Sequence, residues 1–81
     1  MEKYRIELKK SALKELKKVS KKDCKNIWLK ITSLSENPLP IDSKRLFGSE
    51  NYRIRYGKYR ILYRIEKGVL TIFIVKIVNR K

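Results

Sequence analysis

Apolar and polar residues alternate near the start of the chain and again in its second half, and a region of helical spacing separates the two. The alternation over residues 3–8 predicts a short strand. Apolar residues three or four apart then predict two helices, one over residues 11–19 and a second that begins at Ser20. The second helix ends before Pro38 and Pro40, because two prolines this close cannot continue a helix.

Serine residues mark the expected starts of both helices. Ser11 is a candidate N-cap of the first helix and Ser20 of the second, where Asp23 in the first turn suits the helix dipole. The inner stripes of the helices are expected to be Ala12, Leu13, Leu16 and Val19, then Cys24, Ile27, Trp28, Ile31 and Leu34. We therefore interpret Cys24 and Trp28 as core residues.

Two glycine-containing turns divide the second half of the chain. We expect Gly57-Lys58 and Lys67-Gly68 to be two-residue hairpin turns, in which glycine supplies the positive φ. The strands around them span residues 52–56, 59–66 and 69–78, after an extended stretch over residues 43–48. The order β-α-α-β-β-β predicts a single α+β domain over residues 1–81. Its two N-terminal helices pack on one face of a small, mainly antiparallel, twisted sheet.

The first turn determines which residues share a face of the sheet. With Gly57 and Lys58 in the turn, Arg55 lies opposite Arg60. The face toward the helices is then Tyr52, Ile54, Tyr56, Tyr59, Ile61, Tyr63 and Ile65. The other face, which we call the arginine face, is Arg53, Arg55, Arg60, Leu62 and Arg64.

The second turn determines how the last strand meets the arginine face. It sets Val75 opposite Arg60. It also sets Phe73 opposite Leu62 and leaves Ile77 on the same side. Two helices cover only one face of a sheet, so the apolar residues on the other face are expected to form an exposed strip, as is typical of a protein interface. These residues are Leu62, Phe73, Val75 and Ile77. Alternatively, the last strand is central, twisted and partly covered by the chain termini.

The charge of the chain indicates its class of partner. Its net charge is +14, with 22 Lys and Arg residues against 8 Asp and Glu, and self-repulsion of this size destabilises a compact chain. A polyanionic partner accounts for it; the alternative is a protein that is simply very soluble. Most arginines lie in the strand half, and the planar guanidinium suits phosphate. Opposing Arg55 and Arg60 indicate an anion that bridges them, unless this is merely a solvated polar face.

Composition excludes several other classes of site. One cysteine cannot form an internal disulfide, and without histidine a zinc site has almost no ligands. No apolar run approaches the ~18–20 residues that span a bilayer, and no signal peptide is recognisable. We expect a cytoplasmic protein with no metal, no small-molecule cofactor and no membrane contact.

The strand half also carries a recognisable motif. Residues 44–48 (KRLFG) and 52–65 (YRIRYGKYRILYRI) closely resemble the RelE/ParE superfamily of bacterial and archaeal toxins. Members of that superfamily typically show the pattern L.G…yRiRvGdYRviY.i. The order of elements also matches, and the resemblance extends from Tyr4 to Arg80.

The resemblance implies the toxin of a toxin–antitoxin pair, with a cognate antitoxin protein as one partner. RelE-like members cut mRNA in the ribosomal A site without a metal, which implies contacts with mRNA and ribosomal RNA. The 2′-OH of the RNA attacks the adjacent phosphate and leaves a 2′,3′-cyclic phosphate. ParE-like members inhibit DNA gyrase instead. A third alternative is a non-catalytic module that binds RNA or an antitoxin.

The resemblance carries the basic active-site positions of the family onto Arg53, Arg55, Arg60 and Arg80. The first three share the arginine face, whereas simple alternation puts Arg80 on the other face unless a bulge intervenes. The further residues expected to bind RNA are Lys44, Arg45, Lys58, Arg64, Lys76 and Lys81.

The sequence departs from the RelE-type pattern in two respects. RelE-type sites commonly have a tyrosine shortly after the terminal arginine, and none follows Arg80 in this sequence. Several members also have lysines where this chain has Arg53 and Arg55. Arginine stays protonated, so it stabilises charge but does not act as a general base. The candidates for the base stay open among Lys58, Lys76, Asp42 and Glu50.

Overall fold

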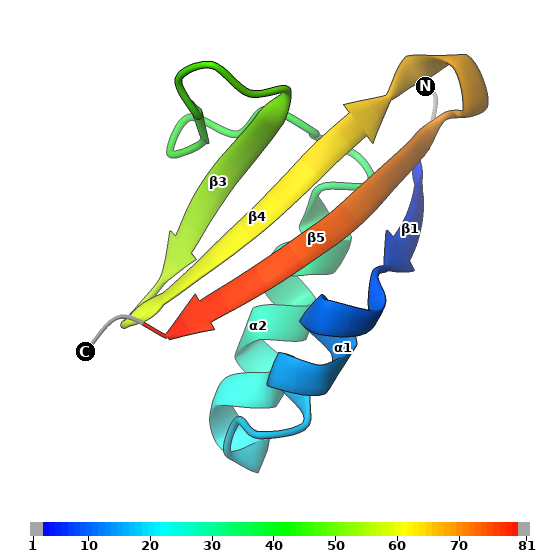
Figure 1. The fold of residues 1–81 in the computed structure, drawn as a ribbon. Coiled ribbons are helices and arrows are strands. Elements are labelled where there is room, and N and C mark those ends of the chain that lie inside the picture. The colour runs from blue at the N-terminus through cyan, green and yellow to red at the C-terminus, as the bar shows by residue number, and fades with distance from the viewer. Residues whose placement is uncertain (1–2, 80–81) are drawn as a thin grey trace.

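The computed structural model describes residues 3–79, which form a five-stranded sheet with two helices on one of its faces (Figure 1). The elements are β1 (Arg5–Leu8), α1 (Lys10–Leu16), α2 (Lys21–Ser33), β2 (Lys44–Arg45), β3 (Asn51–Tyr56), β4 (Tyr59–Glu66), a short 3-10 helix (Lys67–Val69) and β5 (Thr71–Asn79). The predicted α+β class and order of elements are confirmed, with the two-residue β2 lying inside the expected extended stretch.

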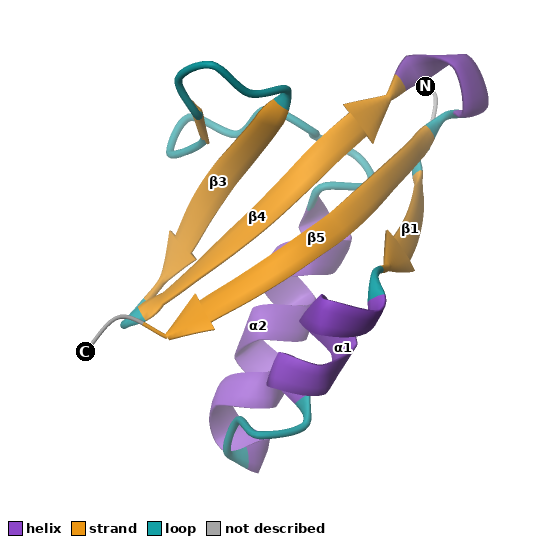
Figure 2. Cartoon of the chain, viewed as in Figure 1, coloured by secondary structure: helices purple, strands orange, loops and turns teal. Residues whose placement is uncertain are grey.

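The sheet has the strand order β1-β5-β4-β3-β2. Strand β1 runs parallel to β5, and the other pairs of neighbours are antiparallel. Figure 2 shows the strands in front and α2 behind them, so one broad face of the sheet is turned away from that helix. The last strand in the chain therefore lies inside the sheet, between β1 and β4.

The buried core lies between the helices and the inner face of the sheet. Its fully buried large side chains are Ile27, Ile31, Leu34, Ile54, Ile61, Tyr63, Ile72, Ile74 and Ile77. The predicted burial of Leu13 and Trp28 in the helical stripes is wrong, because their side chains are 44% and 43% exposed. A helix turns by about 100° per residue, so Trp28 points beside the sheet while its neighbour Ile27 points onto it. Cys24 is half-buried at the edge of the core.

Only one of the two predicted caps forms. The Ser20 side chain accepts a 3.3 Å hydrogen bond from the Asp23 backbone N–H at the start of α2. The N-cap position of α1 is Lys9 instead of Ser11, and α1 ends at Leu16 rather than at residue 19. The Ser11 hydroxyl is used elsewhere, because it donates a 2.7 Å hydrogen bond to the carbonyl of Val75 in β5.

The register between β3 and β4 is the predicted one. Arg55 lies opposite Arg60, and Ile54 lies opposite Ile61. Gly57 has a φ of +55°, which is the left-handed conformation that its position in the turn requires. This turn therefore fixes the arginine face as expected.

The register between β4 and β5 differs from the prediction. The connection is the 3-10 helix followed by Leu70, whose φ is +46°, so Leu70 and not Gly68 takes the left-handed conformation. Further along, a register shift between Leu62 and Tyr63 leaves Val75 as an extra residue in β5.

The bulge at Val75 changes which residues of β5 reach the arginine face. Phe73 lies opposite Arg64, and Val78 lies opposite Arg60. Ile77 moves to the core, where it is 1% exposed, so its predicted place in an exposed strip is wrong. The apolar residues on the arginine face are thus Leu62, Phe73, Val75 and Val78, all of them half-buried.

Helix α1 holds the bulge in place. The Lys9 N–H donates a 2.9 Å hydrogen bond to the carbonyl of Ile74, next to the bond from Ser11 to Val75. A bulge leaves backbone groups outside the ladder, and these two donors satisfy carbonyls at that point. The start of α1 and the irregular part of β5 therefore support each other.

The two turn glycines are expected to respond differently to alanine. Gly57→Ala should destabilise the protein by about 1 kcal/mol, because an alanine pays for the left-handed conformation at φ +55°. Gly68→Ala should be neutral or stabilising, since its φ is not positive and no atom lies within 4 Å of an added Cβ. Urea unfolding of both variants measures the difference, and equal losses of stability would contradict the turn geometry.

Ionisation of Tyr63 is expected to lower the stability of the folded protein at alkaline pH. Burial raises the pKa of Tyr63 from 10.0 to about 12, and its hydroxyl donates a 2.7 Å hydrogen bond to the carbonyl of Pro38. The folded state thus favours the neutral phenol, whose contribution is complete below pH 10.0 and is lost as the pH rises through about 12.

Tyr63→Phe should therefore be less stable at neutral pH by about 1 kcal/mol, because the Pro38 carbonyl loses its donor. It should also lose less stability than the wild type between pH 10.0 and about 12. Urea unfolding across this range measures both effects, with Tyr52→Phe as the matched control. Parallel pH profiles for wild type and Tyr63→Phe would refute the assignment.

Candidate functional site

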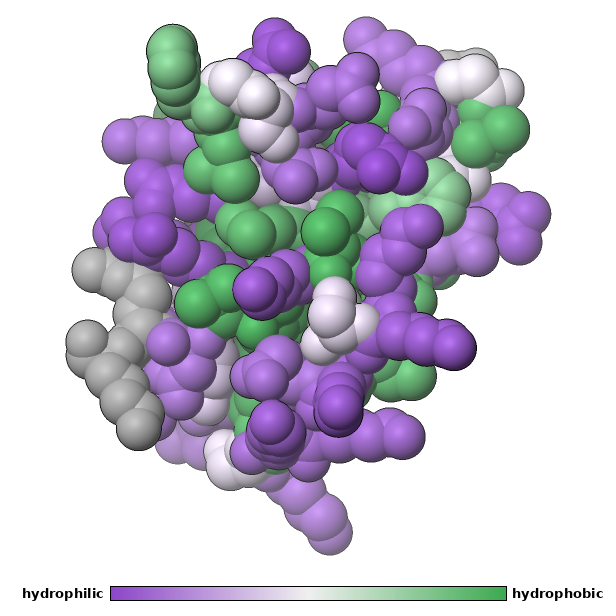
Figure 3. Space-filling view, viewed as in Figure 1, coloured by the Kyte–Doolittle hydropathy of each residue, from purple (hydrophilic) through white to green (hydrophobic). Residues whose placement is uncertain are grey.

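The arginine face is the side of the sheet opposite the two helices. Figure 3 looks onto the strands from that side and shows mostly hydrophilic side chains around an apolar band in the middle of the view. Arg55 is exposed, while Arg53, Arg60 and Arg64 are half-buried. The Nε atoms of Arg60 and Arg64 are buried, so these two side chains lie close against the sheet.

Three strands bring cations together on this face. Arg55 of β3 lies opposite Arg60 of β4, and Lys44 of β2 lies opposite Arg53 of β3. Residues that face each other across antiparallel strands have Cα atoms about 4.5–5.5 Å apart, so these charges are crowded. A shallow groove of about 270 Å³ between β3 and the preceding loop is lined by Lys44, Arg53, Arg55 and Asp42. The geometry suits an extended anion with several charges.

Arg64 forms an ion pair with a carboxylate of its own strand. Its Nε lies 2.9 Å from Oε1 of Glu66, and its guanidinium lies 5.1 Å from the ring centre of Phe73. The Nζ of Lys9 lies 4.9 Å from the same ring. Phe73 therefore has two cations against it, which the sequence pattern did not indicate because the β4–β5 register was predicted differently.

The remaining predicted RNA-binding residues lie around the arginine face. Lys76 is exposed on it, opposite Leu62. Lys58 is in the β3–β4 turn, with its Nζ 5.7 Å from the ring centre of Tyr59. Arg45 pairs with Tyr52, so it alternates with Lys44 and is directed to the other side of the edge strand. There its Nε donates a 3.3 Å hydrogen bond to the Ser49 carbonyl.

Arg80 and Lys81 lie outside the described residues. The bulge at Val75 does reverse the alternation of β5 before that point. As a result Val78 is on the arginine face, opposite Arg60. The predicted roles of Arg80 and Lys81 remain predictions.

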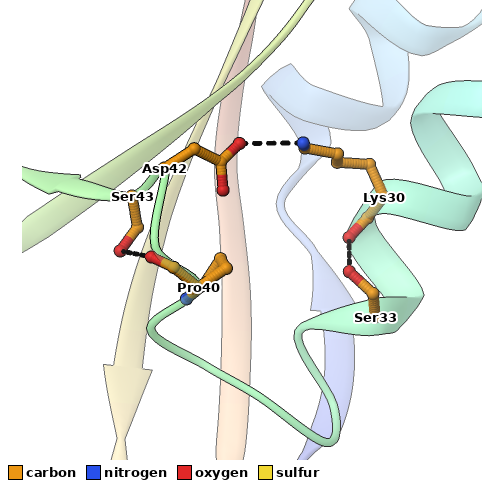
Figure 4. Close-up of polar contacts among 5 residues, drawn as sticks. All are labelled: Lys30, Ser33, Pro40, Asp42 and Ser43. Carbon is orange, nitrogen blue, oxygen red and sulfur yellow. Dashed lines mark hydrogen bonds and ion pairs between the residues drawn. The ribbon is translucent and has the colours of Figure 1, made fainter.

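The Asp42 carboxylate pairs with Lys30 of α2, the helix on the opposite side of the sheet from the arginine face. Its Oδ2 accepts a 2.8 Å hydrogen bond from Nζ of Lys30 on α2 (Figure 4). The hydrogen bond from Lys30, followed by the charge of that ammonium, lowers the pKa of the Asp42 carboxyl. A carboxylate held in this way is a weak proton acceptor. The sequence contains no pattern that pairs residue 30 with residue 42, since the contact depends on how the loop returns past α2.

No group of three His, Cys, Asp or Glu side chains within residues 3–79 lies close enough together to hold a metal ion. No helix in this range has the length and apolar character to cross a membrane.

Comparison with known proteins places the chain among bacterial and archaeal toxins. The family model for the ParE toxin of the type II toxin–antitoxin system parDE matches residues 6–81. The putative toxin RelE1 of Methanocaldococcus jannaschii is 37% identical over 83 residues, which cover 98% of this chain and 92% of that protein.

Solved structures give the same likeness in three dimensions. The archaeal RelE–RelB complex from Pyrococcus horikoshii contains a chain with 27% identity and a TM-score of 0.85, and the match covers 96% of each chain. The RelBE2 toxin–antitoxin complex from Mycobacterium tuberculosis contains one with 26% identity and a TM-score of 0.83, covering 96% of this chain and 99% of that one.

The ion pair between Lys30 and Asp42 predicts a pH dependence of stability. A carboxylate whose pKa is lowered on folding contributes stability above its ordinary value of 3.8, and the contribution is lost as the pH falls through the folded value. Asp42→Asn should therefore be less stable than wild type near neutral pH, with the difference vanishing in strong acid. Urea unfolding at both pH values measures it.

Lys30→Met is the matched control, because it removes the other half of the pair. The double variant should lose no more stability near neutral pH than either single variant. Additive losses would mean that the two side chains do not act together.

Proposed function

We propose that this chain, which belongs to the RelE/ParE superfamily of type II toxins, is a ribosome-dependent endoribonuclease that cleaves mRNA in the A site and so inhibits translation. The observation that supports this most is the register that sets Arg53, Arg55 and Arg60 on one face of the sheet. That face is the side of the sheet opposite the helices (Figure 1).

Cleavage of this kind needs no metal and no covalent enzyme intermediate. The 2′-oxygen loses its proton and bonds to the adjacent phosphorus, and the bond from phosphorus to the 5′-oxygen breaks. The products are a 2′,3′-cyclic phosphate and a 5′-oxygen that takes up a proton. Negative charge builds up on the phosphorane between these steps, and fixed guanidinium groups stabilise it without reorganising.

We assign the arginines two roles. Arg60 and Arg80 hold the scissile phosphate, the latter on the resemblance alone. Arg53 and Arg55 hold neighbouring phosphates or the charge of the transition state. The groove supports this division. Arg55, Arg53 and Lys44 form a row of cations, which we call the cationic track, and it leads away from Arg60.

The candidates for the general base remain Lys58, Lys76, Asp42 and Glu50. Asp42 lines the groove, but Lys30 occupies its carboxylate and lowers its pKa. We therefore propose that alignment of the RNA by the ribosome supplies most of the rate enhancement. Fixed geometry alone can replace a large part of an activation barrier.

We also propose that a cognate antitoxin neutralises the chain. The similar chains from P. horikoshii and M. tuberculosis were crystallised in toxin–antitoxin complexes. A net charge of +14 favours an acidic antitoxin, and the target on translating ribosomes implies a cytoplasmic site of action.

Inhibition of DNA gyrase is the second candidate function. The match of residues 6–81 to the ParE toxin family favours it. The cluster of arginines on the arginine face favours RNA instead, because phosphate recognition accounts for opposed Arg55 and Arg60 and a contact with gyrase does not require it.

A cell-free translation reaction tests the first candidate. Wild type should cut mRNA within codons that occupy the A site, and Arg60→Ala should cut at least ~100-fold more slowly, the loss typical of removing a group that stabilises transition-state charge. Lys25→Ala is the matched control, since it removes one exposed charge from α2 and should keep full activity.

Other outcomes would point to the alternatives. Gyrase-linked DNA breaks without mRNA cleavage would replace the proposal with the second candidate. If neither activity appears and the chain binds a small acidic protein tightly, a non-catalytic module is the better description.

A further inference from the structure

Phe47 is an aromatic residue held entirely in solvent. Its relative exposure is 106%, while every other aromatic side chain within residues 3–79 except Trp28 is buried or half-buried. A small domain has little apolar material to spare for its core, so a phenylalanine that contributes nothing to burial calls for another explanation. The residue lies on the connection between β2 and β3.

The backbone around Phe47 is an ordered tight turn. The Ser49 N–H donates a 3.2 Å hydrogen bond to the Leu46 carbonyl, which closes a four-residue turn. Gly48, at the third position, has a φ of +70°, as a type II turn requires. Behind the turn the Leu46 N–H donates to the Asn51 carbonyl at 2.9 Å, and the Asn51 N–H donates to Oγ of Ser49 at 3.0 Å. Phe47 is therefore presented at a fixed corner rather than on a loose loop.

This corner lies at the end of the cationic track. Strands β2 and β3 lead into the turn, and their pair Lys44 and Arg53 lies on the arginine face. From Arg55 to Asn51, strand β3 extends by about 13 Å at ~3.3 Å per residue. A short single-stranded segment bound along Arg55 and Arg53 would thus reach the turn within a few nucleotides.

We infer that Phe47 stacks on a nucleobase of the single-stranded RNA whose phosphates lie along the arginine face. The inference rests on the proposed function and adds a base-contacting residue to it. Aromatic rings beside a basic groove bind single strands in this way, without preference for sequence, because every base has a flat face. A planar ring suits a base, whereas Ile41, which is 104% exposed on the preceding loop, has no flat surface to offer.

Binding of a fluorescently labelled oligouridylate of about ten nucleotides tests this, because site sizes of single-strand binders are in that range. Phe47→Ala should weaken binding on the order of 10-fold. Phe47→Trp should bind at least as tightly as wild type, and Ile41→Ala should bind like wild type. Thermal unfolding of Phe47→Ala should match wild type, because the ring packs against nothing in the core.

The salt dependence of binding separates stacking from charge. Wild type should show a log–log slope of roughly −2 to −3.5, given three to five phosphate contacts at about −0.7 each. Phe47→Ala should keep that slope, whereas Arg53→Ala should lose about 0.7 of it.

The outcomes distinguish this inference from the proposed function. If wild type and Arg53→Ala behave as expected but Phe47→Ala binds like wild type, the stacking is refuted and the arginine face stands. If wild type shows no salt-dependent binding, both fail. If Phe47→Ala binds RNA normally but loses affinity for an antitoxin, the ring serves a protein partner and the inference is wrong.

Discussion

The pairing of β3 with β4 decides where Arg53, Arg55 and Arg60 lie. Arg55 is directly opposite Arg60, and such like-charged pairs destabilise a sheet by some fraction of ~1 kcal/mol. The residues beneath them hold the register, since Ile54 and Ile61 face each other fully buried in the core. A slip of β3 by one residue against β4 would turn Ile54 to solvent and Arg55 inward. Burial of Ile54 and Ile61 therefore offsets the repulsion between Arg55 and Arg60.

The helices support the same hairpin from the inner side. The Asn26 side chain of α2 donates a 2.8 Å hydrogen bond to the hydroxyl of Tyr56, which adjoins the Gly57 turn. Lys30, one turn further along α2, holds Asp42 at the opposite border of β3. Helix α2 thus fixes both the tip of the hairpin and the loop that borders the groove. Because both contacts come from the inner side, the arginines on the opposite face are left accessible to a ligand.

The sequence predicted the parts of the site that depend on local rules. The alternation of residues and the glycine turn at Gly57 were enough for the β3–β4 register, because two-residue turns leave only one pairing. The β4–β5 register was not predictable, since Leu70 adopts a left-handed conformation that glycine usually takes and Val75 forms a bulge. Both depend on contacts with β1 and α1, which lie far away in sequence. Trp28 was misplaced because a periodic stripe does not show where the sheet ends.

The position of β5 has a consequence for how the protein acquires its shape. Strand β5 lies between β1 and β4, and Arg5 of β1 pairs with Thr71, so the two ends of the described chain must meet before the sheet is complete. Contacts of such long range slow folding, because the chain must close a long loop before they form. Strand β1 therefore stays without its partner until residues 71–74 have been synthesised, and the sheet that carries the arginine face is completed only after that point.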